Sequence, residues 1–150
     1  MTTADGISTE EWDIVHQLGV DIVNATINAT GQEEDRCRAR LFEYLDKLEA
    51  KYGELPSILA TRADSLSDLD IERQVDLLKR SYVLANARDD ARNRLYAAHS
   101  LAALYIDECR NSGEGARWLE RLQQDLTQVD DGLFAEEYTR LCNELTRIRE

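Results

Sequence analysis

The chain contains two histidines, and we first considered whether either belongs to a metal site. Di-iron helical bundles carry a carboxylate and a histidine three residues apart on each of two helices. Asp13 and His16 have this spacing, whereas Tyr96 occupies the corresponding position before His99. Half of such a site does not hold a metal ion. We therefore expect His16 to be a surface or partly buried residue, and no bound metal.

The acidic stretch from Asp64 to Asp70 is the second candidate for metal binding. It has the density of carboxylates found in EF-hand calcium loops. Leu66 occupies a ligand position, Leu69 the position of the invariant glycine, and Val75 the position of the final glutamate. These substitutions remove the calcium ligands, so the stretch is interpreted as a solvated turn.

His99 is also the best candidate for general base catalysis. It stands among Ala98 and Leu101 in the most apolar stretch of the chain, which favours a core histidine with satisfied hydrogen bonds. The alternative is that His99 faces a groove together with Tyr96 or Asp107. No glycine-rich phosphate loop follows a strand. The sequence therefore predicts no catalytic residue and no cofactor, and we expect that the protein is not an enzyme.

The three cysteines do not form a disulfide framework or a zinc site. They are odd in number, far apart and without a CxxC pair, at Cys37, Cys109 and Cys142. Free cysteines on helices behave as small hydrophobic residues. The first residues lack the pattern of a secretory signal, and no apolar stretch approaches the length of a membrane span. We expect a cytoplasmic protein that does not insert into a membrane.

The charge of the chain limits its partners. Lysine and arginine number 18 against 30 acidic residues, for a net charge of −12. Such a chain repels phosphate backbones, which argues against nucleic-acid binding. It attracts a basic protein instead.

These residues are positioned by helices. One proline and seven glycines in 150 residues favour helices over a turn-rich β fold. Apolar residues recur at helical spacing over seven stretches: 8–30, 32–52, 56–66, 69–88, 91–109, 114–126 and 133–149. Residues 1–7 are expected to be disordered, and residues 8–150 to form a single all-helical domain. Gly31 is expected to end the first helix.

Two pairs of helices within residues 55–127 carry alternating small and large side chains. The pairs, 56–66 with 69–88 and 91–109 with 114–126, are offset by about 35–40 residues, a period typical of helical repeats. The residues that carry the pattern are Leu59, Ala60, Leu78 and Ser81 in the first pair, and Leu101, Ala102, Tyr105, Gly115, Leu119 and Leu122 in the second.

This region resembles the tetratricopeptide-repeat family. The resemblance implies antiparallel hairpins in a short right-handed solenoid, whose first helices line a concave face that binds a peptide or protein. The outer helices, 8–30 and 133–149, would then cover the ends of the stack. An irregular helical bundle is the alternative fold.

The sequence thus predicts a non-enzymatic protein-binding module. The most concrete hypothesis is an acidic immunity protein or antitoxin that occludes a cytotoxic partner such as a basic nuclease. The alternative is an adaptor or regulatory scaffold, similar to tetratricopeptide-repeat proteins, that binds a peptide segment. A metal-dependent bundle enzyme using Asp13, His16 and His99 is the third hypothesis. The candidate partner-binding residues are Tyr52, Tyr82, Tyr96, His99, Asp89 and Asp90.

Overall fold

The computed structural model describes residues 1–28, 31–66 and 70–150, and these residues form an all-α fold. The expectation of about seven helices is confirmed. The helices are α1 (Thr9–Asn28), α2 (Gly31–Tyr52), α3 (Pro56–Asp64), α4 (Ile71–Ala87), α5 (Ala91–Ala103), the π-helical segment η1 (Leu104–Glu108), α6 (Ser112–Leu126) and α7 (Gly132–Arg149).

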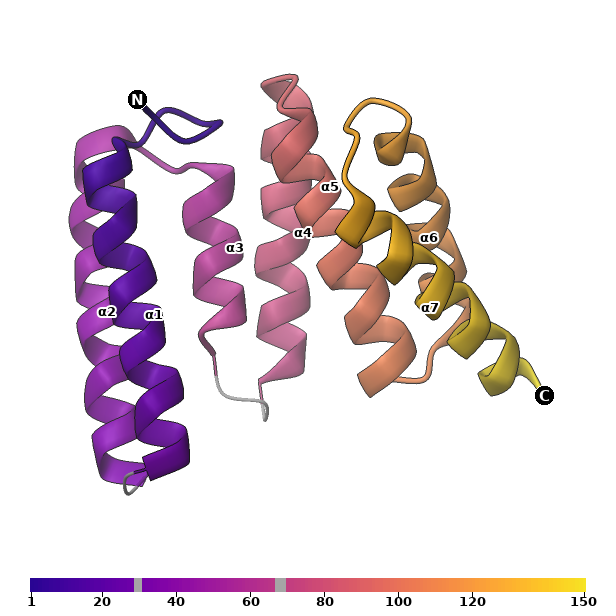
Figure 1. The fold of residues 1–150 in the computed structure, drawn as a ribbon, viewed down its shortest axis with the longest axis horizontal. Coiled ribbons are helices and arrows are strands. Elements are labelled where there is room, and N and C mark those ends of the chain that lie inside the picture. Colours follow the sequence, from indigo (N-terminus) through magenta and orange to yellow (C-terminus); the bar gives the residue numbers. More distant parts are fainter. Residues whose placement is uncertain (29–30, 67–69) are drawn as a thin grey trace.

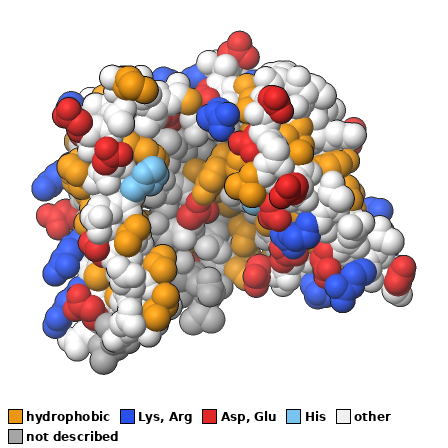
Figure 2. All heavy atoms as spheres, viewed as in Figure 1, with side chains coloured by type: hydrophobic (Ala, Val, Ile, Leu, Met, Phe, Trp, Pro, Cys, Tyr) orange, Lys and Arg blue, Asp and Glu red, His pale blue; other side chains and the backbone are white. Residues whose placement is uncertain are grey.

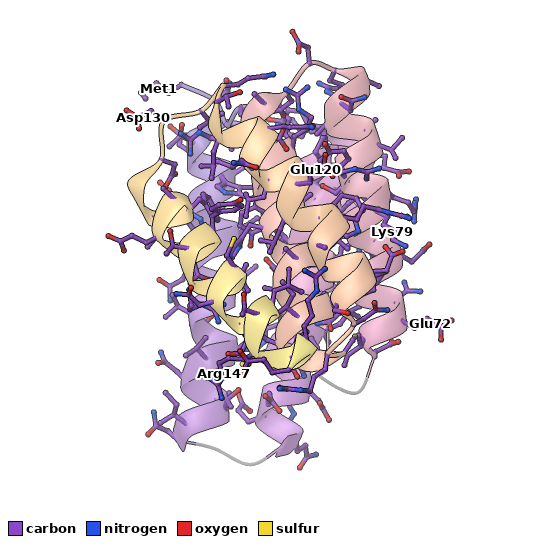
Figure 3. The ribbon with its side chains drawn as sticks, turned by 90° about the vertical axis from the view of Figure 1, so that its right-hand side faces the viewer. Met1, Glu72, Lys79, Glu120, Asp130 and Arg147 are labelled. Carbon is purple, nitrogen blue, oxygen red and sulfur yellow. The ribbon has the colours of Figure 1, made fainter. Side chains whose placement is uncertain are left out.

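Consecutive helices run antiparallel and stand side by side along the longest axis of the molecule (Figure 1). The pairs α1 with α2, α3 with α4, and α5 with α6 pack against each other, and α4 also packs on α5. Helix α7 packs on α6 and on the end of α5. Figure 3, which looks onto α6 and α7, shows these two helices covering the C-terminal end of the molecule.

Two apolar clusters form the core, because each helix pair buries its own amphipathic faces. The N-terminal cluster includes Leu41, Leu45 and Leu48 of α2. The larger cluster joins α3 to α7 and includes Leu101 of α5 and Trp118 of α6, both buried.

Residues 1–7, which we expected to be disordered, instead pack against the N-terminal cluster. Ile7 is completely buried, and the buried Asp5 side chain accepts a hydrogen bond of 2.8 Å from the backbone N–H of Ser57. Ser57 lies in the first turn of α3, where Leu55 supplies no side-chain cap. Asp5 therefore satisfies a free helix N–H from 52 residues away in sequence.

Ser8 caps the start of α1, but only half of a capping box forms, because the Ser8 backbone N–H donates to the Tyr52 hydroxyl at 3.4 Å and not to Glu11. The backbone N–H of Glu11 donates to Ser8 Oγ at 3.2 Å, and Ser8 Oγ donates to Glu11 Oε1 at 2.7 Å. The expected end of this helix is wrong, because Gly31 is the first residue of α2 and α1 ends at Asn28. The predicted helix start at position 69 lies outside the described residues.

The helix predicted over 91–109 changes from an α-helix to a π-helix. From Leu104 onward it is π-helical, with the N–H of Cys109 donating to the Leu104 carbonyl at 3.0 Å. The turn brings the fully buried Ile106 against the start of α6. There Gly115 allows a close approach, since a Cβ on this residue would lie 2.5 Å from Ile106 Cγ1.

We predict that Gly115→Ala lowers the free energy of unfolding by about 1–2 kcal/mol, because the added methyl group overpacks the contact with Ile106. Gly113→Ala is the matched control in the same helical turn, where a Cβ meets only Asn111 Oδ1 at 3.7 Å. It should be neutral or stabilising by up to about 1 kcal/mol, as alanine favours helix. Urea unfolding followed by circular dichroism measures both. Equal stability of the two variants would contradict a close approach at Gly115.

Candidate partner-binding groove

The molecule has a hollow on one face, between α1 on one side and α5 with α7 on the other (Figure 2). A pocket of about 340 Å³ lies in this hollow. It is lined by Trp12, His16 and Gly19 of α1, Ala60 and Thr61 of α3, and Tyr96 of α5. We call this hollow the groove.

Helix α1 has two apolar faces, and only one of them is buried. Val15 and Ala25 are buried on the face that meets α2. The second face carries the exposed Val20, Val23 and Ile27, and at its N-terminal end Trp12, which is partly buried against the N-terminal cluster. We call these four residues the groove stripe. At 100° per residue, these four side chains lie on the same side of α1 as the pocket residues His16 and Gly19.

The groove stripe is open to solvent along most of its length. The exposed fractions are 49% for Val20, 56% for Val23 and 72% for Ile27. Figure 2 shows hydrophobic side chains following the α1 side of the hollow. A contiguous apolar patch of this kind is unusual on a monomer and is typical of an interaction surface.

An aromatic cluster lies on the opposite side of the groove. The ring of Phe134 in α7 packs edge-on against Tyr96, with centroids 6.3 Å apart, and lies 4.9 Å from the centroid of His99. His99 is therefore not in the core, as we had preferred, but is partly exposed beside Tyr96. The neighbouring Ala98, in contrast to His99, is fully buried.

Polar contacts hold the aromatic cluster in place. The Tyr96 hydroxyl donates to Asp64 Oδ2 of α3. Burial of Tyr96 and the neighbouring Asp64 charge raise the pKa of this phenol. The pKa of Asp64 is also raised, because loss of hydration outweighs the hydrogen bond from Tyr96 and the nearby His99. The bond fixes the ring of Tyr96 and leaves an acidic group beside the groove.

The His99 side of the cluster is fixed by an ionic network. His99 Nε2 lies 2.9 Å from Glu137 Oε1, and Arg140 Nε donates to Glu137 Oε2 at 2.7 Å. Arg140 Nη2 also donates to Asp107 Oδ2 at 2.9 Å. The hydrogen bonds from Arg140 and then His99 lower the pKa of Glu137 to about 2. The positive charge of Arg140 is thus already matched by two carboxylates.

The predicted site residues Tyr52 and Tyr82 lie away from the groove. The hydroxyl of Tyr52 donates to Glu11 and so joins the end of α2 to the start of α1. Tyr82 packs edge-on against Trp118, with centroids 5.1 Å apart, between α4 and α6. Both contacts stabilise packing between helices.

The predicted site residues Asp89 and Asp90 form the turn between α4 and α5. The Asp90 side chain caps α5 by accepting from the Asn93 N–H at 3.1 Å. Asp89 Oδ1 lies 3.6 Å from Arg94 Nη1. Of the six predicted residues, only Tyr96 and His99 therefore lie beside the groove.

Sequence reasoning missed the groove stripe and Phe134. Trp12 packs against the core cluster that contains Val15, but the exposed Val23 lies about 80° around the helix from Val15. The signal was present, since the apolar residues at positions 20, 23 and 27 have a 3–4 residue spacing of their own beside the core positions. The role of Phe134 depends on a contact with a helix 35–38 residues earlier and has no local signal.

Among the described residues, metal ligands do not converge on the groove. His16 is exposed and packs edge-on against Trp12, with centroids 6.1 Å apart. Within residues 1–28, 31–66 and 70–150, no three histidine, cysteine or acidic side chains are placed to hold a metal ion. Cys37, Cys109 and Cys142 are free thiols.

Comparison of the chain with protein-family models, with curated proteins and with solved structures gave no match. Among the helices that the structure describes, none combines the length and the apolar character needed to cross a bilayer. The proposals below are therefore based on the groove itself, on its apolar and aromatic sides and on the charge around it.

The Glu137 network predicts a specific acid sensitivity. The pKa of Glu137 in the folded state is about 2, below the ordinary value of 4.5, so the unfolded state binds a proton more readily. The carboxylate therefore stabilises the fold above pH 4.5, and this contribution is lost as the pH falls towards 2. We expect Glu137→Gln to unfold with a weaker pH dependence between pH 4.5 and 2 than the wild type.

The exposed neighbour Glu136 provides the matched control. Glu136→Gln should keep the pH dependence of the wild type when thermal unfolding is followed by circular dichroism from pH 2 to 7. If both variants had the wild-type slope, the network around His99 would not be formed in solution.

Proposed function

We propose that this chain is a non-enzymatic protein-binding module and that the groove is its binding site. The observation that carries the proposal is the run of Val20, Val23 and Ile27 in the groove stripe, which are apolar and yet exposed in the described chain. The opposite side supplies Tyr96 and Phe134, and aromatic side chains are enriched where interfaces gain most of their affinity. A partner segment placed between the two sides would bury both.

The more specific form of the proposal is an immunity protein or antitoxin that acts by occlusion in the cytoplasm. The net charge of −12 supports it, because such a charge accelerates and orients association with a basic toxin such as a nuclease. The three free thiols suit a reducing compartment. A chain of 150 residues that covers the functional surface of its partner inhibits that partner by binding alone.

The second candidate is an adaptor or regulatory scaffold that binds a peptide segment. The groove supports it, because a pocket of about 340 Å³ between neighbouring helices accepts side chains of a short segment. We further propose that the hairpins are of the tetratricopeptide-repeat kind. The buried alanines Ala98 and Ala102 and the close approach at Gly115 support this, since small residues allow helices to stack closely.

The test of protein binding compares the same substitution at two exposed valines on different helices. Val23 lies in the groove stripe, and Val83 is 68% exposed on α4. Val83 and Lys79 line a second pocket, separate from the groove. Figure 3 shows Lys79 on the side of the molecule away from α7. The substitutions Val23→Glu and Val83→Glu add the same charge, so they alter long-range attraction equally.

We expect the chain, co-expressed with the products of genes adjacent to its own, to form a complex that weakens as salt rises. Val23→Glu should weaken this complex at least tenfold, and Val83→Glu by less than about twofold. Isothermal titration calorimetry of the purified partners measures the difference. A complex that Val83→Glu disrupts and Val23→Glu leaves intact would contradict the groove as the site.

The two specific forms are distinguished by the size of the binding unit. An immunity protein requires the folded toxin domain and should protect cells that express it. An adaptor binds an isolated synthetic segment of its partner with similar affinity. Protection without segment binding would contradict the adaptor, and segment binding without protection would contradict the immunity protein.

A further inference from the structure

Helix α1 lacks a helical neighbour on its groove side. It packs chiefly against α2, whereas α5 contacts α4, α6 and α7. The pocket of about 340 Å³ separates α1 from α3 and α5. The position beside α1 is thus occupied by no element of the described chain.

The spacing of the groove stripe is that of a helix–helix contact. Its residues recur every three to four positions, with His16 completing the spacing between Trp12 and Val20. From Trp12 to Ile27 the stripe extends about 22 Å at 1.5 Å per residue, the length of a helix of about 15 residues. Such a row of side chains forms the ridges into which a second helix packs.

The backbone of α1 cannot bind an extended strand. Between its first and last turns, the N–H and C=O groups are bonded within the helix, whereas strand addition requires a free sheet edge. Recognition along α1 must therefore use side chains alone. An amphipathic helix satisfies its own backbone hydrogen bonds and can present apolar side chains at the matching spacing.

The acidic groups near the groove stripe favour a partner of positive charge. Helix α1 contains four acidic residues and no lysine or arginine; the exposed Asp13 lies next to the stripe, whereas Glu11 pairs with Lys51 and Asp21 lies on the far side of the helix. The Asp64 carboxylate, which accepts from the Tyr96 hydroxyl, adds an acidic group next to Tyr96. The nearby arginines are already paired, Arg92 with Asp131 at 3.5 Å and Arg140 with its two carboxylates.

We infer that the groove binds a basic amphipathic α-helix of a partner protein. The apolar face of this helix covers Val20, Val23 and Ile27 and contacts Tyr96, and its lysines and arginines lie beside Asp13 and the other acidic groups. The inference rests on the proposed protein-binding function and specifies its partner. A second copy of the chain is disfavoured as the occupant, because two chains of charge −12 repel each other.

The probe is a capped 16-residue peptide of leucine and lysine with its leucines on one helical face. One control peptide has the same composition with leucine and lysine alternating, and another replaces lysine with glutamate. We expect the first peptide to bind, to gain helix by circular dichroism, and to weaken with salt. In fluorescence anisotropy the alternating peptide should bind at least tenfold more weakly, and the glutamate peptide should not bind.

Variants of α1 then place the peptide on the groove stripe. Val20→Ser and Ile27→Ser should each weaken binding about tenfold, because both side chains lie under the apolar face. Ile14→Ser is the matched control, because Ile14 is an aliphatic residue of the same helix that is 45% exposed and lies on the side of α1 away from the stripe at 100° per residue. It should change the affinity by less than twofold. Serine and valine have similar helix propensities, so the fold is retained.

Several results would overturn the inference. Equal binding of the ordered and alternating peptides would show that charge alone attracts them. A dimer in sedimentation that Ile27→Ser dissociates would identify a second copy as the occupant. A natural partner sensitive to Val23→Glu that competes with no helical peptide would exclude a helix while leaving the proposed function intact. A natural partner insensitive to Val23→Glu would instead contradict the proposed function.

Discussion

The constraint on which this structure depends is that one helix has two apolar faces and the fold covers one of them. Val15 and its neighbours on the first face bury against α2, as an amphipathic helix must. Val20, Val23 and Ile27 on the second face remain exposed. A monomer gains nothing from this arrangement in water, because exposed aliphatic side chains forgo the free energy of burial. The arrangement is explained if another molecule covers the second face.

The polar contacts of α1 fix it without closing the groove. The hydrogen bond from Tyr52, followed by that from Ser8, lowers the pKa of Glu11 to about 2, and Lys51 adds an ion pair at 3.1 Å. At the other end, Thr26 Oγ1 donates to Glu34 Oε1 at 2.6 Å. These partners belong to α2 or to the N-terminal segment. The apolar second face is thus held at a defined position while staying free to bind.

The helices could be predicted from the sequence because their signals are local. Apolar spacing and the cap at Ser8 depend on residues within a few positions of each other. The errors arose where distant residues decide the outcome: Asp5 caps a helix that begins beyond position 55, and Ile106 packs against Gly115 through a π-helical turn. Gly31 was misplaced because a glycine also tolerates the first turn of a helix.

The groove was harder to predict than the fold. Tyr96 and His99 were identified from their residue types, but Tyr52 and Tyr82 share those properties and serve packing instead. Only the arrangement of helices separates the two uses of an aromatic side chain. The groove stripe is visible in the sequence as a second set of spaced apolar residues on α1. Whether a neighbouring helix covers that face, however, depends on the arrangement of the whole fold.

Hydrogen exchange of the α1 backbone with and without its partner tests this account most directly. Residues 20–28 are rich in β-branched side chains of low helix propensity and are packed on one side only, so their amides should exchange readily in the free protein. The account predicts that partner binding slows exchange in this part of α1 more than anywhere in α4 or α6. Protection confined to α4 and α6, with residues 20–28 unchanged, would contradict it.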